Sequence, residues 1–76
     1  MNTQDQLIAL VKKIGKIQGA EIQASTHIKA FGFDSLDLLE FQMEVDELFG
    51  IEVQIEDFLK CQTLADISAL VDACRQ

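Results

Sequence analysis

The chain of 76 residues has no proline, tryptophan or tyrosine, and its four glycines are scattered. Without a proline- or glycine-rich stretch, the sequence offers no linker at which two domains could separate. A chain of this length also has room for only one small hydrophobic core. We therefore expect a single domain over residues 1–76, too small to enclose a deep catalytic cleft.

Long apolar runs and export signals are also missing. No stretch approaches the ~20 apolar residues that a membrane-spanning helix needs. Residues 1–5 contain neither the basic segment nor the apolar segment of a secretory signal. We therefore expect a cytoplasmic protein without a membrane span, in which Cys61 and Cys74 stay reduced rather than pairing in a disulfide.

Histidine occurs only once, which restricts the catalytic options. A hydrolytic serine needs a base within hydrogen-bond reach, but His27 stands eight residues before Ser35 and no G-x-S-x-G motif is present. His27, Cys61 and Cys74 lack the spacing of zinc ligands. Leu39 occupies the position where a calcium-binding loop requires glycine. The sequence therefore indicates neither a catalytic triad nor a metal site.

The charge is unevenly distributed along the chain. Thirteen acidic and six basic residues give a net charge of −7. No Lys or Arg lies between Lys29 and Lys60, a stretch that contains nine of the acidic residues. Such a charge repels the phosphates of nucleic acids and anionic membrane surfaces. The acidic stretch indicates either a solvated helix face or a surface that attracts a basic protein partner.

Hydrophobic residues at helical spacing predict an all-α fold, a small four-helix bundle of three main helices and one short helix. The first helix is expected over residues 4–17, with Thr3 and Gln6 placed as a capping box. The helical period is lost over residues 18–34. We expect this segment to be a long, partly packed loop between the first and second helices.

The remaining helices are predicted mainly from residues that typically begin or end a helix. The second is expected over residues 35–49, with Ser35 as its N-cap and Gly50 in the left-handed position after its last turn. A short third helix is expected near residues 55–60, where the apolar pattern also permits a strand. The fourth helix follows Thr63, which is placed as an N-cap.

The predicted second helix has apolar residues on two sides. The side that we expect to face the core carries Leu38, Phe41, Val45, Leu48 and Phe49. The opposite side carries Leu36, Leu39 and Met43, interleaved with acidic residues. These three residues either pack under the preceding loop or form a docking surface. We favour the docking surface, because its acidic rim would steer basic partners to apolar contacts.

Ser35 has two interpretations at the start of this helix. As a structural residue, a serine N-cap contributes about 1 kcal/mol by accepting a hydrogen bond from a backbone amide. A phosphate ester on Ser35 would also lie near the free amides and partial positive charge of a helix N-terminus, where anions are stabilised. The position therefore suits a phosphorylated serine.

The segment Gly32-Phe33-Asp34-Ser35-Leu36, the acidic second helix, the long preceding loop and the closing amphipathic helix resemble the acyl carrier proteins and related thiolation domains. The resemblance extends over essentially the full chain. It implies that Ser35 receives 4′-phosphopantetheine from coenzyme A through a phosphodiester, and that the thiol of this arm carries acyl groups as thioesters. It also implies a carrier and not an enzyme, because the arm only presents intermediates to other proteins.

The resemblance further implies partners that dock on the second helix through basic patches. They are the phosphopantetheinyl transferase and the acyl-loading and acyl-processing synthase enzymes of fatty-acid, polyketide or related acyl metabolism. The matching docking positions are Asp34, Leu36, Asp37, Glu40, Met43, Asp46 and Glu47. In related carriers the acyl chain enters between the helices, and the candidate lining residues here are Phe41, Val45, Phe49 and Ile67. The acidic residues would repel a second copy, so we expect a monomer.

Some positions depart from the family pattern. Lys29 and Ala30 stand where fatty-acid carriers often have acidic residues, and His27 stands where an aromatic core residue is common. The form of the motif around Ser35 favours an acyl cargo, with a peptidyl or aminoacyl carrier as the alternative within the family. Outside the family, the competing function is an unmodified acidic helical adaptor in which Ser35 is only a helix cap.

Overall fold

The computed structural model of the protein describes residues 2–15 and 22–75. Its elements in chain order are α1 (Thr3–Ile14), the 3-10 helix η1 (Ile28–Phe31), α2 (Ser35–Phe49), α3 (Ile55–Leu59) and α4 (Leu64–Cys74). No strand occurs within the described ranges. The predicted all-α fold with three main helices and one short helix is confirmed.

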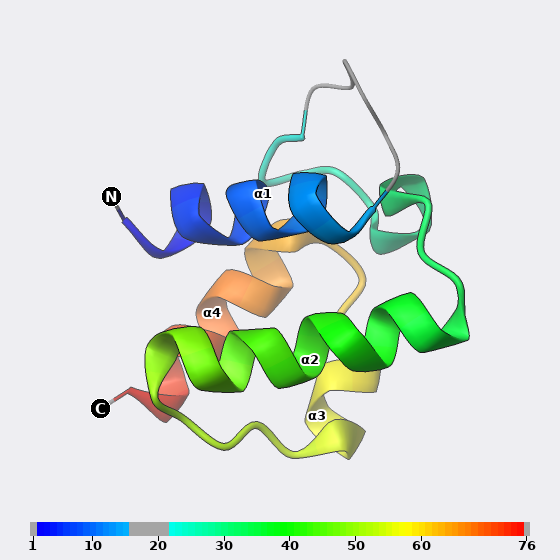
Figure 1. Ribbon diagram of the computed structural model, residues 1–76. Coiled ribbons are helices and arrows are strands. Elements are labelled where there is room, and N and C mark those ends of the chain that lie inside the picture. Colours follow the sequence, from blue (N-terminus) through cyan, green and yellow to red (C-terminus); the bar gives the residue numbers. More distant parts are fainter. Residues whose placement is uncertain (1, 16–21, 76) are drawn as a thin grey trace.

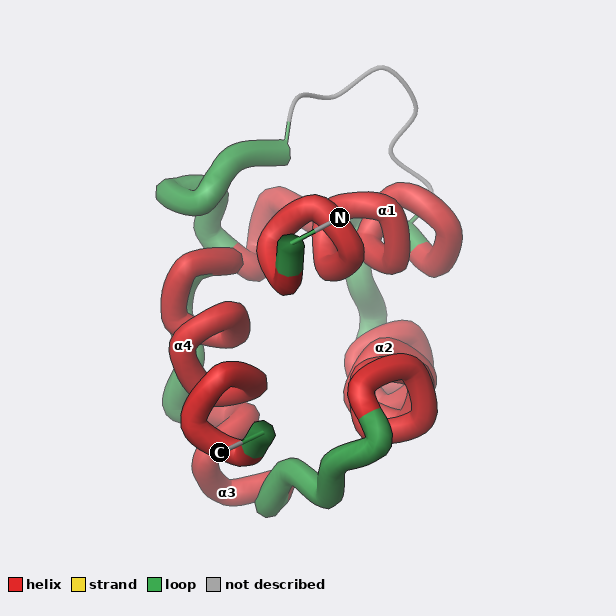
Figure 2. The backbone as a smooth tube through the Cα atoms, turned by 90° about the vertical axis from the view of Figure 1, so that its left-hand side faces the viewer, coloured by secondary structure: helices red, strands yellow, loops and turns green. Residues whose placement is uncertain are grey.

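The three longer helices enclose a common core. α1 and α2 run antiparallel, and α4 crosses behind them (Figure 1). Seen from the end, α1, α2 and α4 surround the centre of the molecule (Figure 2). α1 packs against both α2 and α4, and α3 packs against α4.

The core takes apolar side chains from every helix. The buried residues are Leu7, Leu10, Val11, Ile14, Ile22, Phe31, Phe41, Val45, Val53, Phe58, Cys61, Leu64, Ile67 and Val71. Four phenylalanine rings form a continuous series from Phe31 through Phe33 and Phe41 to Phe58, with centroid separations of 5.5, 5.2 and 5.9 Å. Aromatic pairs at such separations are stabilising beyond the area that they bury. The series links η1, α2 and α3.

The first helix begins and ends differently from the prediction. Asn2 is the N-cap, and its side chain accepts a hydrogen bond of 2.8 Å from the backbone N–H of Asp5. Thr3, the predicted cap, is already inside the helix. The helix ends at Ile14 because Gly15 is extended, with φ −73° and ψ 139°. Residues 16 and 17 of the predicted helix lie outside the described residues.

Apart from the N-cap of α2, the other predicted helix boundaries are confirmed to within one residue. Gly50 has φ 65° and ends α2, a conformation that glycine adopts without steric cost. α3 covers most of the predicted short helix. Thr63 caps α4 in a reciprocal capping box with Asp66.

The segment before α2 contains a helix that the sequence pattern did not predict. η1 follows His27, which forms an isolated antiparallel bridge with Thr63. The backbone N–H of Ile28 donates to the carbonyl of Gln62 at 2.9 Å. Ile22 and Phe31 are buried and Ile28 and Phe33 are partly buried, as expected of a partly packed segment. Residues 18–21 of the predicted loop lie outside the described residues.

The start of α1 and the end of α4 are tied together. The Thr3 hydroxyl donates to Asp72 Oδ1 at 2.9 Å, and Arg75 Nη1 donates to the same hydroxyl at 3.2 Å. The Arg75 guanidinium also lies over the Phe49 ring, 5.5 Å from its centroid. These contacts gather the ends of α1, α2 and α4 at the side of the molecule opposite the start of α2 (Figure 1).

Candidate functional site

The N-terminus of α2 is capped by Asp34 and not by Ser35. Asp34 Oδ1 accepts a hydrogen bond of 2.8 Å from the backbone N–H of Asp37, and Asp37 Oδ2 accepts one of 3.3 Å from the N–H of Asp34. The prediction of Ser35 as the cap is wrong by one residue. A reciprocal box needs a polar side chain three residues after the cap, and Leu38 would occupy that place if Ser35 were the cap.

This shift leaves the side chain of Ser35 without a structural role. Ser35 is the first residue of α2 and is exposed. Its hydroxyl has no hydrogen bond within residues 2–15 and 22–75. The hydroxyl is therefore accessible at a helix N-terminus, where an attached phosphate would meet favourable backbone dipoles.

Ser35 lies beside an open pocket of about 390 Å³, which we call the Ser35 pocket. Its lining residues come from η1, the segment after it and the first turn of α2: Ile28, Lys29, Phe33, Asp34, Ser35 and Leu38. Ile28, Phe33 and Leu38 are partly buried and pack against the core. Lys29 is the one cation among the lining residues. The pocket thus combines an apolar surface with one basic group next to the free hydroxyl.

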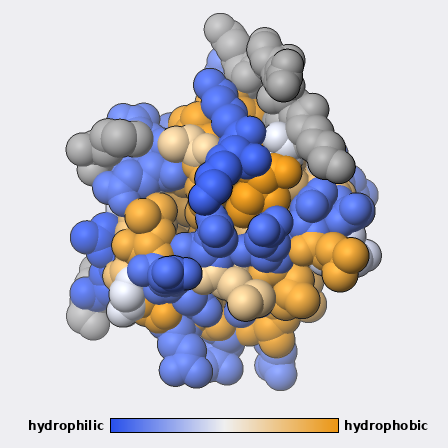
Figure 3. Space-filling model, viewed as in Figure 1, coloured by the Kyte–Doolittle hydropathy of each residue, from blue (hydrophilic) through white to orange (hydrophobic). Residues whose placement is uncertain are grey.

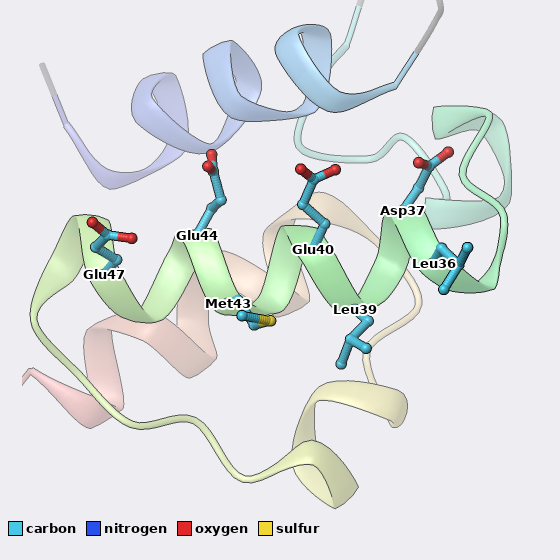
Figure 4. Close-up of a pocket in the computed structure, with 7 residues that line it drawn as sticks. All are labelled: Leu36, Asp37, Leu39, Glu40, Met43, Glu44 and Glu47. Atoms are coloured by element: carbon cyan, nitrogen blue, oxygen red, sulfur yellow. The ribbon is translucent and has the colours of Figure 1, made fainter.

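A second open pocket of about 420 Å³ runs along the exposed side of α2, and we call it the acidic groove. It is lined by Leu36, Asp37, Leu39, Glu40, Met43, Glu44 and Glu47. The four carboxylates form a row along the edge of α2 nearer to α1, and the apolar side chains project from other sides of the helix (Figure 4). The surface of the molecule on this side interleaves hydrophobic and hydrophilic patches (Figure 3).

The apolar residues of the acidic groove are free of the preceding loop. Leu36 is 76% exposed and Met43 is 62% exposed, and Leu39 is also exposed. The alternative in which these side chains pack under the loop is therefore wrong. Exposed apolar residues gathered beside one another and rimmed by charges are typical of a surface that binds another protein.

The predicted docking residues occupy three different places. Five of the seven line the acidic groove: Leu36, Asp37, Glu40, Met43 and Glu47. Asp34 lines the Ser35 pocket instead. Asp46 Oδ1 accepts a hydrogen bond of 3.0 Å from the backbone N–H of Val53, and so holds the segment after α2. Leu39 also lines the groove, as the helical spacing that groups it with Leu36 and Met43 predicted, whereas Glu44 lines it without having been predicted.

One residue of the predicted core side of α2 faces solvent. Leu48 is 50% exposed, whereas Phe41 and Val45 are fully buried. Leu48 is offset by about 60° from Val45 around the helix, which places it at the margin of the apolar side. It lines a third open pocket of about 270 Å³ with Leu10 and Lys13 of α1. The Lys13 ammonium is 3.3 Å from a carboxylate oxygen of Glu44 and ties α1 to α2.

The candidate residues for lining an acyl chain belong to the core. Phe41, Val45 and Ile67 are buried, and Phe49 packs partly buried against them. None of the four lines the Ser35 pocket.

The two cysteines and the histidine lie outside the lining of the Ser35 pocket. Cys61 and Cys74 are unpaired, and neither lines the Ser35 pocket. Burial raises the pKa of the Cys61 thiol, and the nearby carboxylates of Asp66 and Asp57 raise this pKa further. Cys61 is therefore protonated at neutral pH and weakly reactive. His27 Nδ1 accepts a hydrogen bond of 3.1 Å from the backbone N–H of Lys29 and caps η1.

Most of the chain, including Ser35, matches one known protein family. Residues 5–71 match a family model described as "Phosphopantetheine attachment site". The chain belongs to this family. The cofactor of this phosphopantetheine-binding domain is accordingly 4′-phosphopantetheine, and the domain is a carrier and not a catalyst. The predicted family resemblance is confirmed.

Curated relatives of this phosphopantetheine-binding domain are acyl carrier proteins. The chain is 38% identical over 71 residues to acyl carrier protein 2, chloroplastic, of Arabidopsis thaliana, and the match covers 92% of this chain and 52% of the relative. It is 34% identical over 62 residues to the mitochondrial acyl carrier protein of Dictyostelium discoideum, covering 82% of this chain and 52% of the relative. The chain thus spans about half the length of these curated relatives.

A solved structure supports the fold of the domain. The acetyl actinorhodin acyl carrier protein from Streptomyces coelicolor is similar in fold, with a TM-score of 0.73 and 20% sequence identity. The similarity covers 99% of this chain and 91% of the other. At this identity the likeness establishes the four-helix fold and not a shared cargo. No helix within the described ranges is long and apolar enough to cross a membrane.

Proposed function

We propose that residues 1–76 form one acyl carrier domain, in which Ser35 bears the 4′-phosphopantetheine arm and the arm presents acyl thioesters to partner enzymes. The observation that carries this proposal is the division of roles at the start of α2. Asp34 and Asp37 make the capping box, so the exposed Ser35 hydroxyl is not needed for the helix. Modification of Ser35 therefore removes no capping interaction from the fold.

Attachment of the arm is a phosphoryl transfer to the serine oxygen. Ser35 Oγ attacks the phosphorus atom that bears pantetheine in coenzyme A, and a new phosphorus–oxygen bond forms. The bond to the second phosphate breaks, adenosine 3′,5′-bisphosphate leaves, and the hydroxyl proton passes to a base of the transferase. When bound, the arm supplies the thiol that carries the acyl group.

The residues around Ser35 fit such an arm. The arm joins an anionic phosphodiester to a chain of methyl, methylene and amide groups. The Ser35 pocket offers apolar side chains from Ile28, Phe33 and Leu38, together with the basic side chain of Lys29. Apolar surface with a few polar groups is the usual composition of a binding site for a small organic group.

The acidic groove supports the proposed partners. We propose that it binds basic patches on the phosphopantetheinyl transferase and on acyl-loading and acyl-processing enzymes of fatty-acid, polyketide or related metabolism. Its exposed leucines and methionine supply contact area, and its row of carboxylates steers the encounter. A second copy of the chain carries the same negative groove, which favours a monomer.

The compartment and cargo are further parts of the proposal. An acyl cargo, rather than an aminoacyl cargo, is supported by relatives that are named acyl carrier proteins.

For the compartment of this protein we propose the cytosol, whereas the names of two relatives refer to the chloroplast and the mitochondrion. Cell fractionation followed by immunodetection of this chain tests the location, and recovery in an organelle fraction would overturn it.

Intact-mass measurement tests the attachment to Ser35. The purified protein is incubated with coenzyme A and a broad-specificity phosphopantetheinyl transferase, and we expect a gain of one phosphopantetheinyl group that peptide mapping places on Ser35. Ser35→Ala should stay folded by circular dichroism and gain no mass. The matched control Ser25→Ala, which alters an exposed serine outside the Ser35 pocket, should load like the wild type.

Two outcomes would contradict the proposal. Loading of Ser35→Ala at another residue would overturn the assignment of the attachment site. No gain of mass by the folded wild type, in a reaction that loads a known carrier, would favour the acidic adaptor.

A further inference from the structure

Two carboxylates near Ser35 would repel the phosphodiester of an attached arm, although the helix N-terminus favours an anion. Asp34 precedes Ser35 and Asp37 follows it on the first turn of α2, and both carboxylates belong to the capping box. The phosphodiester is an anion at neutral pH, so its charge would be repelled by these two neighbours. The helix amides compensate only in part, because Asp34 already accepts from the N–H of Asp37.

Lys29 is the residue that can offset this repulsion. It is the only cation among the lining residues of the Ser35 pocket. Its side chain is exposed, and its ammonium group makes no ion pair within the part of the chain that the structure describes. Lys29 therefore supplies an unpaired basic group in the same pocket as Ser35 and Asp34.

The backbone of η1 determines where Lys29 lies. The N–H of Lys29 donates to His27 Nδ1 at 3.1 Å, and the N–H of Ile28 donates to the carbonyl of Gln62 at 2.9 Å. The first of these bonds caps η1, and the second joins it to the segment before α4. Lys29 is therefore presented by a short helix that is anchored at its start, and not by an unattached loop.

We propose that Lys29 is a positioning residue for the arm: its ammonium group pairs with the phosphodiester on Ser35 and orients the pantetheine chain along the apolar side chains of the Ser35 pocket. The inference rests on the proposed attachment at Ser35. A charge-assisted contact to phosphate fixes one end of the arm. Ile28, Phe33 and Leu38 then offer apolar surface to its methyl and methylene groups.

The test compares the modified forms of four proteins: the wild type, Lys29→Gln, Lys29→Arg and the control Lys60→Gln. Lys60 is an exposed lysine that does not line the Ser35 pocket, so its substitution makes the same change in net charge elsewhere. Each protein is loaded enzymatically from coenzyme A whose pantetheine amides are labelled with ¹⁵N. The readouts are the ³¹P chemical shift of the phosphodiester and the ¹⁵N relaxation of the amides of the arm.

In the wild type and in Lys60→Gln, we expect the motion of the amides of the arm to be restricted. The ³¹P chemical shift of the phosphodiester in these two proteins should differ from that of a modified serine peptide. In Lys29→Gln both signals should move to the peptide values, and Lys29→Arg should retain most of the restriction. High salt should move the wild type in the same direction as Lys29→Gln, because ions screen an exposed pair.

The outcomes separate this inference from the proposed function. Equal ³¹P shifts and arm relaxation in wild type and Lys29→Gln would overturn the role of Lys29 while attachment stands. Slower loading of Lys29→Gln with an unchanged arm would also overturn it, and would show that Lys29 contacts the transferase instead. Failure of the wild type to gain mass would overturn the proposed function and this inference together.

Discussion

Asp34 and Ser35 are adjacent residues with separate roles at the start of α2. Asp34 makes a reciprocal pair of hydrogen bonds with Asp37, while the Ser35 side chain makes none within the described ranges. The first turn of the helix therefore depends on the aspartates. Chemistry on the serine hydroxyl can proceed without disturbing this turn.

This division predicts different stabilities for two alanine variants. Asp34→Ala should lower the free energy of unfolding by about 1 kcal/mol, because the N-cap is lost. Ser35→Ala should change it by less than about 0.5 kcal/mol, since an exposed side chain without a partner is removed. Urea unfolding followed by far-UV circular dichroism measures both. The reverse order of stabilities would show that Ser35, and not Asp34, caps the helix.

At the scale of single residues, the sequence predicted where α2 begins but assigned its N-cap to Ser35 instead of Asp34. Aspartate and serine are almost equally good N-caps, so composition does not choose between Asp34 and Ser35. The partner three residues later does choose, because Asp37 can complete a capping box and Leu38 cannot. The same rule placed Thr63 correctly, where Asp66 is the partner, but it placed the first cap at Thr3, one residue after the actual cap Asn2.

At the scale of elements, the longer helices were predictable and η1 was not. Each long helix repeats apolar residues over several turns, which gives a clear periodic signal. η1 has only four residues, too few to show a period. It is held by contacts distant in sequence, the bridge from His27 to Thr63 and the hydrogen bond from Ile28 to Gln62. The Ser35 pocket was missed for the same reason, because η1 supplies Ile28 and Lys29.

The contact between the end of α1 and η1 makes Gly15 sensitive to substitution. A Cβ atom on Gly15 would lie 2.4 Å from the carbonyl oxygen of Phe31 and 2.9 Å from that of Val11. Both neighbours are backbone atoms, so η1 or the end of α1 must move. Gly15→Ala should destabilise the fold by about 1–3 kcal/mol. Thermal unfolding measures the loss, and wild-type stability would contradict the close approach.

The capping box of α4 predicts a dependence of stability on pH. Hydrogen bonds from the backbone N–H groups of Gln62 and Thr63 hold the pKa of Asp66 below its ordinary value of 3.8. A lowered pKa in the folded state means that this contribution is present above pH 3.8 and is lost as the pH falls through the folded-state pKa.

Asp66→Asn should therefore lose less stability than the wild type on acidification. Urea unfolding of both proteins between about pH 6 and pH 2 measures the difference. Parallel curves for the two proteins would show that Asp66 contributes nothing to the acid response.

At the scale of the whole molecule, the fold gathers negative charge on one side. Residues 30–59 contain nine acidic and no basic residues, and most of this stretch folds into α2 and the segment after it. Lys13 pairs with Glu44, the one ion pair within the described ranges, and leaves most of the acidic groove uncompensated. The charge asymmetry was readable from the sequence. Its placement beside Leu36, Leu39 and Met43 was also predicted from helical spacing, and the structure established that these three side chains are exposed.

The negative charge of the acidic groove predicts that reversing one of its charges changes the rate of phosphopantetheinylation in a salt-dependent way. Glu40→Lys should slow phosphopantetheinylation by about threefold or more at low salt and much less at high salt, because ions screen long-range steering. The control Glu52→Lys reverses an exposed acid that does not line the acidic groove and should slow the reaction less. Initial rates of loading by mass spectrometry measure both variants. Equal rates for Glu40→Lys and Glu52→Lys at every salt concentration would contradict docking at the groove.

The tie among Thr3, Asp72 and Arg75 also determines how the domain can be joined to other chains. It brings both ends of the described chain to one side of the molecule, and α2 begins at the other (Figure 1). A fluorescent reporter or an affinity handle fused at either end would leave from the side remote from Ser35. Surface immobilisation through either end would accordingly keep the serine turned toward solution, where enzymes can reach it.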